Sequence, residues 1–296
     1  MQAQLVRDRI VGNFGTLPGQ LQKAARFILE NPDDVALLSM REQARRAGIQ
    51  PWTMSRLAKR LGFDNYEAIR TVYADAMRQG AVGFAGRASA QVEVQKARGE
   101  IELARDIITL TAAQIHRLCE PAALRAMSEA AIRLDAARRI FCLGLRSSHS
   151  VASQFAYVMS LLGEKATLVD CRAGAGLDAI RMATPEDAIL AVSIAPYTTA
   201  TVQAARYAGS RGVPIVAITD SPVAPLAAIA QGVVLVTTDS PSFFHAMAPA
   251  FVVAEVLAAL VAGRGGEASL AALTETERQL SEFGIHWRGE PQRKHA

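Results

Sequence analysis

Apolar positions in the first quarter of the chain follow a helical period. From Leu21 to Met77 they recur at spacings of three and four residues, with short breaks at "ENPDD", at Gly48 and at "LGFDN". This spacing places the apolar side chains on one face of each helix. The sequence therefore predicts an all-α N-terminal domain built from several short helices.

The apolar pattern changes after Arg139. Short continuous apolar runs now alternate with segments of helical length, and the runs read "RIFCLGL", "KATLVD", "DAILAVSI", "VPIVAITD" and "GVVLVTT". Buried strands separated by helices are typical of a parallel sheet with helices on both faces. The pattern predicts a doubly wound α/β domain with a five-stranded parallel sheet.

The stretch between these two patterns is rich in small and polar residues. It reads "AVGFAGRASAQVEVQKARG" and is interpreted as a linker, part of which extends a neighbouring helix if the helical spacing continues into it. Further helices are predicted near residues 100–118, 122–136, 246–261 and 269–283. We expect an N-terminal domain over 1–80, a linker over 81–99, a second domain over 100–285 and a frayed polar tail over 286–296.

Length and composition agree with two separate hydrophobic cores and indicate where in the cell the protein is expected. Half of the 296 residues are apolar, no run of about 18 uncharged apolar residues occurs, and the N-terminus lacks the apolar centre of a signal peptide. We expect a cytoplasmic protein without a membrane partner. Cys119, Cys142 and Cys171 lack metal-ligand spacing, so they are interpreted as reduced and structural, with no metal and no cofactor.

Positive charge is concentrated near the N-terminus. The net charge is +4; residues 1–80 hold 12 Lys and Arg against 8 Asp and Glu, whereas residues 81–296 hold 20 of each. Six of the basic residues fall within residues 41–60, where Glu42 is the one acidic residue. Such a surface suits a polyanion such as nucleic acid, although a solvated helical face has the same composition.

Residues 39–63, "SMREQARRAGIQPWTMSRLAKRLGF", contain two helices joined by a tight turn. Ser39 can cap a helix that ends near Ala47, Gly48 supplies the turn, and Pro51 suits the first position of the next helix. On the second helix one apolar stripe is predicted to be buried, formed by Met54, Leu57, Ala58 and Leu61.

The opposite face of that second helix is predicted to point away from the core. Its residues are Trp52, Thr53, Ser55, Arg56, Lys59 and Arg60. In a major groove, base edges would be reached by Thr53, Ser55 and Arg56, and phosphates would be held by Arg41, Arg45, Lys59 and Arg60. Trp52 belongs to the same expected DNA-binding surface. The alternative is an ordinary three-helix subdomain with a basic face.

The segment "LQKAARFILENPDDVALLSMREQARRAGIQPWTMSRLAKRLGFDNYEAIR" resembles the helix-turn-helix domain of RpiR-family bacterial transcriptional regulators. In that family the N-terminal domain precedes a sugar isomerase (SIS) domain, and the downstream "PYTTAT" fits this reading. The resemblance implies double-stranded operator DNA as a partner, a flavodoxin-like strand order and a homodimer or homotetramer. Gln50 stands where the family usually has Ser; Gln caps a helix poorly, but its amide could read adenine.

A SIS domain implies a sugar phosphate site at the carboxyl ends of the strands. The first loop of the family usually reads G-x-G-x-S; here Gly144 and Ser148 match, and Arg146 replaces the second glycine. A guanidinium at this point is a strong bidentate partner for an anion, or else it forms a salt bridge on the loop.

The second SIS loop usually reads S-x-S-G-x-T and corresponds to "SIAPYT" here. Ser193 and Thr198 match, whereas Ala195 and Pro196 depart from the pattern. Hydroxyls and free backbone N–H groups before a helix can hold a phosphate, or can simply cap a helix over 199–210. The expected ligand-binding residues are Arg146, Ser147, Ser148, Ser193, Tyr197, Thr198, Thr199 and Thr201. Two later loops, "TDSPVAPLA" and "TDSPSFFH", are expected at the same rim.

Catalysis would need a general base near the substrate. The candidates are His149, His245 and Glu255, and no pair of titratable groups stands out among them. The hypothesis is therefore a DNA-binding transcriptional regulator that senses a sugar phosphate or related metabolite, with no catalytic residue. The alternatives are a sugar phosphate isomerase with a helical appendage and a scaffold with an inactive pocket.

Overall fold

The computed structural model describes residues 2–78, 83–170 and 176–287. It divides into two compact units, each of which is described by itself. The first comprises Met1–Ala123, Thr219–Ile229 and Leu235–Pro249. The second comprises Leu124–Ile218, Ala230–Val234 and Ala250–Ala296.

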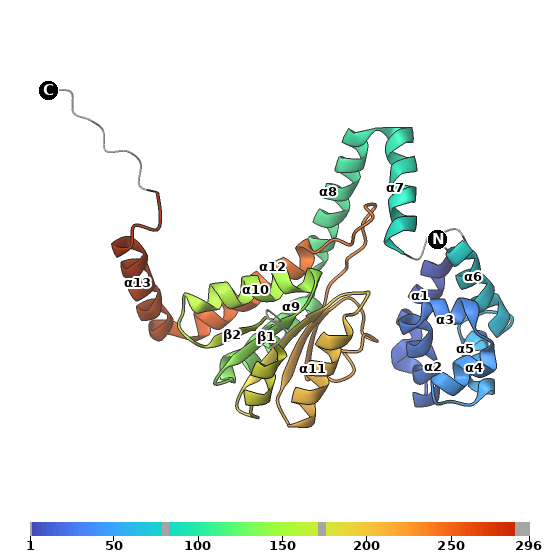
Figure 1. The fold of residues 1–296 in the computed structure, drawn as a ribbon, viewed down its shortest axis with the longest axis horizontal. Coiled ribbons are helices and arrows are strands. Elements are labelled where there is room, and N and C mark those ends of the chain that lie inside the picture. The colour runs from blue at the N-terminus through green and yellow to red at the C-terminus, as the bar shows by residue number, and fades with distance from the viewer. Residues whose placement is uncertain (1, 79–82, 171–175, 288–296) are drawn as a thin grey trace. The chain divides into compact units, whose positions relative to one another are not determined.

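The N-terminal part of the first unit is helical throughout its described residues, which confirms the predicted all-α region. The helices α1 to α6 gather into one bundle, and α7 and α8 form a hairpin (Figure 1). Their bounds are α1 Gln2–Asn13, η1 Phe14–Thr16, α2 Gly19–Glu30, α3 Pro32–Leu37, α4 Met40–Arg46, α5 Pro51–Arg60, α6 Tyr66–Arg78, α7 Phe84–Arg98 and α8 Glu100–Arg117.

A buried glutamine joins three helices of the N-terminal bundle. Gln43 of α4 is fully buried among apolar side chains, and its amide donates to the carbonyl of Leu38 at 2.8 Å and that of Val35 at 3.2 Å. Its amide oxygen accepts a hydrogen bond from the Tyr66 hydroxyl of α6. Because a buried amide must be satisfied, these bonds fix α4 against the end of α3 and the start of α6.

Most of the stretch predicted as a linker is a helix. The helix α7 ends at Gly99, whose φ of 86° is a conformation that glycine adopts readily. Within the first unit, α7 packs on the segment that follows the last strand: Phe84 stacks on Phe244 at 5.7 Å, and Gln91 accepts a hydrogen bond from the backbone N–H of Phe243 at 2.9 Å. These contacts hold α7 in place.

The second unit is built on a five-stranded parallel sheet of order β2-β1-β3-β4-β5, as predicted. The strands are β1 Ile140–Gly144, β2 Ala166–Val169, β3 Ala188–Ser193, β4 Ile215–Thr219 and β5 Gly232–Leu235. The remaining elements are α9 Pro121–Ala136, α10 Ser147–Ser160, η3 Gly176–Met182, α11 Thr199–Ser210, α12 Ala248–Arg264 and α13 Gly266–Glu282. Figure 1 shows α10 and α11 on opposite faces of the sheet, the doubly wound arrangement.

A buried carboxylate ties the starts of β1 and β3 together. The Asp187 side chain is 0% exposed and accepts hydrogen bonds from the guanidinium groups of Arg138, at 3.1 Å, and Arg139, at 3.3 and 3.4 Å. It also accepts one from the Thr184 backbone N–H at 2.9 Å. Burial alone would raise the pKa of Asp187, but these hydrogen bonds outweigh it and hold the pKa well below its usual range.

The cysteines differ in exposure. Cys142 is buried in β1, where burial raises the pKa of its thiol, whereas Cys119 is exposed; Cys171 lies outside the described residues. Among those residues no group of three His, Cys, Asp or Glu side chains could hold a metal ion. The described part of the chain contains no single helix that is long and apolar enough to cross a bilayer, and α12 and α13 meet that test only as a pair bent by 110°.

Candidate functional sites

The turn between α4 and α5 has the predicted geometry. The Ser39 hydroxyl caps α4 by accepting from the Glu42 N–H at 3.3 Å. The helix ends at Gly48, with a φ of 64°, where the N–H groups of Gly48 and Ile49 donate to the carbonyls of Arg45 and Ala44 at 3.2 and 3.0 Å. This pair of hydrogen bonds is a Schellman motif, so glycine is required at the turn.

The start of α5 also agrees with the sequence. Pro51 occupies its first turn, and Gln50 is the N-cap residue but forms no side-chain capping bond. The predicted stripe of Met54, Leu57, Ala58 and Leu61 is buried, with 0 to 4% exposure. The amide of Gln50 is therefore not engaged by the helix it precedes, and the residue is exposed.

The prediction that Thr53 and Ser55 point outward is wrong for Thr53, whose exposure is 2%. Thr53 lies one turn before Leu57 on α5, so it extends the buried stripe. Ser55 is half-buried, and its hydroxyl donates to the Met40 sulfur at 3.5 Å. Of the two hydroxyls expected to reach base edges, that of Thr53 is thus buried and that of Ser55 is bonded to Met40 of α4.

The exposed cations of α4 and α5 fall into two groups. Arg45 and Arg46 hydrogen-bond to Glu42 at 2.8 and 3.2 Å, and Arg46 also pairs with Asp34 at 2.8 Å. Hydrogen bonds from Arg45 and Arg46 lower the pKa of Glu42 to about 2. The second group is exposed and forms no ion pair within the described ranges; it consists of Arg41, Arg56, Lys59 and Arg60.

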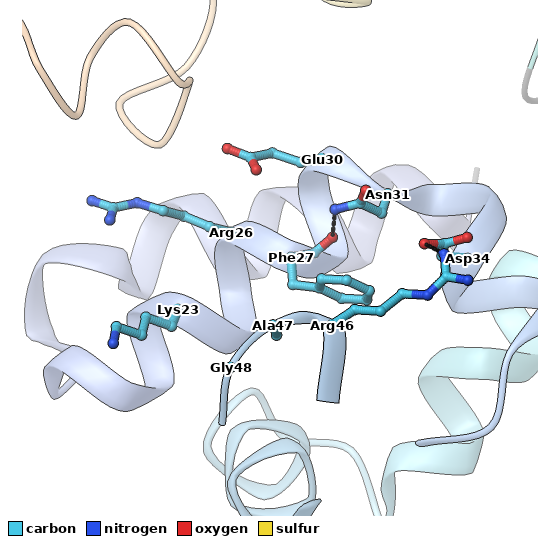
Figure 2. Close-up of a pocket in the computed structure, with 9 residues that line it drawn as sticks. All are labelled: Lys23, Arg26, Phe27, Glu30, Asn31, Asp34, Arg46, Ala47 and Gly48. Atoms are coloured by element: carbon cyan, nitrogen blue, oxygen red, sulfur yellow. Dashed lines mark hydrogen bonds and ion pairs between the residues drawn. The ribbon is translucent and has the colours of Figure 1, made fainter. Parts of the chain in front are cut away.

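Two surface hollows flank the motif. Figure 2 shows the larger, of about 550 Å³, where Arg46 reaches across to Asp34 while Lys23 and Arg26 of α2 extend away from it. Its lining mixes both signs of charge, so it does not define an anion site. The smaller, of about 310 Å³, is lined by Gln20, Arg45, Gly48, Ile49, Gln50, Trp52 and Thr53. Gln20 was not predicted, because only the packing of α2 beside α5 brings it there.

In the second unit, the loop after β1 requires a glycine at one end and keeps a strained arginine in its middle. A Cβ on Gly144 would lie 2.5 Å from the backbone oxygen of Ser148, so no larger residue fits. Arg146 has a φ of 55°, a region that favours glycine, yet it carries an exposed side chain. Ser147 begins α10, and Ser148 is buried at 4% exposure.

The loop after β3 presents hydroxyls at the start of α11. Ser193 is 2% exposed, and Thr198 is the N-cap residue but makes no side-chain capping bond. Thr201 is 0% exposed, and its hydroxyl has no hydrogen-bond partner in the described part of the chain. Tyr197 is half-buried and Thr199 is exposed, while the peptide bond between Ala195 and Pro196 is cis.

Strand pairing brings these two loops to one edge. Gly144 of β1 is paired with Val192 of β3, so the residues that follow each strand emerge next to each other. In the order 2-1-3-4-5 the chain turns in opposite directions after β1 and after β3, and ligands of open α/β sheets bind at such a point. The loop predicted after β2 lies largely outside the described residues.

The later loops belong to the first unit, where they contact N-terminal elements. Asp220 directly follows β4, and its carboxylate lies 3.1 Å from Arg7 of α1. Val223 of the same loop is buried in the core of the N-terminal bundle. His245 stacks on Phe244 at 4.1 Å, and its pKa is lowered by burial and by Arg87, partly opposed by Asp220.

The candidate bases occupy different surroundings. Glu255 is exposed on α12, and His149 is half-buried in the first turn of α10. His245 is buried, at 8% exposure, and its lowered pKa favours the neutral ring at pH 7. The three candidates stand on different parts of the chain, His149 on α10, Glu255 on α12 and His245 in the segment before α12.

Comparison with known proteins identifies the second half of the chain. The family model described as the SIS domain matches residues 133–262. These residues include all five strands, and the strand order and helices on both faces agree with that fold. The C-terminal region is therefore a SIS domain.

Two relatives that match about three fifths of this chain are a transcriptional regulator and a transcription factor. The chain is 25% identical over 190 residues to the uncharacterized HTH-type transcriptional regulator YfhH of Escherichia coli, a match that covers 62% of this chain and 64%, less than two thirds, of YfhH. The sugar isomerase domain of an RpiR transcription factor from Sphaerobacter thermophilus is 28% identical, with a TM-score of 0.55, over 60% of this chain and 99% of that one.

A structure of NanR from Vibrio vulnificus, complexed with ManNAc-6P, extends the likeness in fold. It covers 94% of this chain and 98% of NanR at 21% identity, with a TM-score of 0.52. The relatives of this chain are thus RpiR-type helix-turn-helix transcriptional regulators with a C-terminal SIS domain, which confirms the resemblance found in the sequence.

Proposed function

We propose that this protein is a cytoplasmic transcriptional regulator whose DNA affinity is set by a sugar phosphate or a related carbohydrate metabolite. The N-terminal bundle binds double-stranded operator DNA, and the SIS domain binds the effector without transforming it. The family of its relatives supports both halves, and the NanR complex with ManNAc-6P supports a phosphorylated sugar as the class of effector.

On the DNA side, α5 enters the major groove. Gln50 and Arg56 reach base edges, because both are exposed near its N-terminal half. Phosphates are held by exposed cations, namely Arg41, Arg45, Lys59 and Arg60. Thr53 and Ser55 are left out of the contact set, since Thr53 is buried and the Ser55 hydroxyl faces Met40.

On the effector side, the observation that carries the proposal is the backbone of Arg146. A non-glycine residue at a φ of 55° is held there against its own preference, which is typical of binding and catalytic loops. The Arg146 guanidinium and the N-termini of α10 and α11 favour an anion at the adjoining ends of β1 and β3. The remaining ligands are hydroxyls, from Ser147, Ser148, Ser193, Tyr197, Thr198, Thr199 and Thr201.

A route between sensing and DNA binding is offered by the loop after β4. Asp220 extends a strand of the sheet that holds the effector loops, and it forms an ion pair with Arg7 of the N-terminal bundle. An effector that binds one arrangement of this loop better than another changes DNA affinity, with a coupling of about 1 to 3 kcal/mol.

The protein acts as a homodimer or homotetramer. A single helix-turn-helix contacts too few bases for a specific site, so two copies should read half-sites about 34 Å apart, or a multiple of that distance. Light scattering at micromolar concentration measures the mass. A monomer that binds one unrepeated site tightly would contradict this assembly.

The decisive experiment measures thermal shifts with sugar phosphates, polyols and sugar acids for the wild type and Arg146→Gly. Glycine suits the local φ, so this variant keeps the wild-type free energy of unfolding or gains up to about 1 kcal/mol. It loses the charge-assisted contact to the effector, about 1.5 to 3 kcal/mol, and with it most of the ligand-induced shift.

Two further variants complete the comparison. Ser193→Ala loses a neutral hydrogen bond of about 0.5 to 1.5 kcal/mol and should show a smaller reduction of the shift. Arg125→Ala, which removes an exposed arginine of α9, should keep the full shift. A full shift in both Arg146→Gly and Ser193→Ala would place the effector elsewhere.

A further inference from the structure

The recognition helix α5 carries an exposed aromatic residue that stability does not explain. The Trp52 side chain is 55% exposed in the first turn of α5. One turn later, the guanidinium carbon of Arg56 lies 5.1 Å from the centroid of the Trp52 ring. An indole left in water contributes little to the core, and an exposed cation–π contact is weak.

What distinguishes Arg56 is the kind of group that holds it. Arg45 and Arg46 are held by the carboxylates of Glu42 and Asp34, as described above. No ion pair of Arg56 occurs in the described part of the chain, and an aromatic face restrains it instead. A carboxylate competes with DNA for a guanidinium, whereas a ring face leaves the N–H edge of the guanidinium unoccupied.

The stack also reduces the freedom of a long side chain. Arginine loses much rotamer entropy when it binds, and a guanidinium that already lies flat on a ring loses less. The N–H edge that remains matches the O6 and N7 acceptors of guanine, and the apolar ring beside it suits the 5-methyl group of a neighbouring thymine.

We propose that Trp52 is a positioning residue that orients Arg56 on a guanine, and that the pair reads a guanine next to a thymine in each half-site. This inference rests on the proposed function as a DNA-binding regulator. It adds to that function the base step that is recognised and the residue, Trp52, that orients the arginine contacting it.

The test is selection of bound duplexes from a random pool by the full chain, followed by affinity measurements on the selected site. Wild type should enrich a guanine with an adjacent thymine in each half-site. Trp52→Ala should weaken binding to that site about tenfold and lose most of the guanine preference, within the range for one bidentate base contact. Trp52→Phe should retain the preference, because it restores a ring face under Arg56.

Two controls separate this role from a structural one. Arg56→Lys should weaken the guanine preference, because an ammonium group has no planar fork that can lie flat on the Trp52 ring while its edge meets O6 and N7. Tyr207→Ala removes a similar stack at the end of α11, where Arg211, the C-cap residue, lies 5.6 Å from the ring, and should leave the selected sequence unchanged. Thermal midpoints show that each variant is folded.

The outcomes are distinct. If Trp52→Ala loses affinity equally for all sequences and keeps the guanine, Trp52 contacts the DNA backbone and the inference is wrong, while the proposed function stands. A selected site without a guanine next to a thymine would likewise show that the inference is wrong, while the proposed function stands. If wild type enriches no sequence and binds no DNA, the proposed function falls and the inference falls with it.

Discussion

Two clusters of arginine and carboxylate groups, one in each unit, use the same chemistry for different ends. In the second unit the Asp187 side chain is 0% exposed and holds Arg138 and Arg139. In the first unit Glu42 is 32% exposed and holds Arg45, which is 72% exposed. A buried carboxylate must keep its partners, because an unpaired buried charge is strongly unfavourable. An exposed one can exchange them for water or phosphate at little cost.

The largest effect should follow from removing the buried carboxylate of Asp187. Asp187→Ala leaves two arginines without their shared partner at the start of β1 and β3, and we expect the free energy of unfolding to fall by about 3 kcal/mol. This value is at the lower end for a buried ion pair, because Arg138 and Arg139 remain partly in water. Denaturant unfolding measures it. Asp178→Ala, at an exposed carboxylate of η3, is the control and should have little effect.

The same carboxylate should make stability depend on acid pH. The pKa of Asp187 is lower in the folded protein than the usual value of about 3.9 for an unfolded chain. Its contribution is therefore complete above about pH 5 and is lost as the pH falls through the unfolded and then the folded pKa. Unfolding of the wild type and Asp187→Asn, followed from pH 7 to pH 3, tests this. Parallel pH profiles for the two proteins would contradict the assignment.

The comparison predicts that Arg45, which is paired with Glu42, and Lys59, which is not, have unequal effects on DNA binding. Lys59→Ala should reduce the slope of log K against log salt by about 0.9, the value for one phosphate contact. Arg45→Ala should reduce it less, since Arg45 must first leave Glu42. Salt titrations of both variants on one duplex measure the slopes. Equal slopes would mean that the Glu42 pair does not restrain Arg45.

The smallest effect should follow from Glu42→Gln. This change keeps the hydrogen bond from the backbone N–H of residue 42 to the Ser39 hydroxyl. It removes a negative charge near the expected position of the DNA phosphates and releases Arg45 and Arg46. DNA affinity should rise by about twofold at low salt and less at high salt, because exposed charges are screened. Weaker binding would show that Glu42 orients Arg45 for DNA and does not compete with it.

Much of the fold was predictable because its signals are local. Each of the five strands is a short apolar run, and the turn at Gly48 combines a capping serine, a glycine and a proline at standard positions. Helix α7 was less clear, because its small and polar residues suit a linker equally well. Its place depends on Phe84 and Gln91 meeting a segment about 150 residues later, which no local pattern reveals.

Prediction of the sites was limited by packing between elements. Helical periodicity placed Met54 and Leu57 in the core, but the burial of Thr53 depends on how the other helices pack around α5. The packing of α2 beside α5 brings Gln20 to the hollow next to Gln50. Arg146 was recognised as a departure from a glycine pattern, yet only the backbone shows that this non-glycine residue has a conformation that favours glycine.

The hydrogen bonds of Gln43 have a mechanical consequence. One buried amide fastens α4 to its neighbours, and α4 leads through the Gly48 turn directly into α5, so we expect α4 and α5 to move as one stiff part. A stiff part can be displaced but is difficult to reshape. For the dimeric regulator proposed above, this predicts that the effector changes the spacing between the two α5 helices, while the sequence that each α5 prefers stays the same.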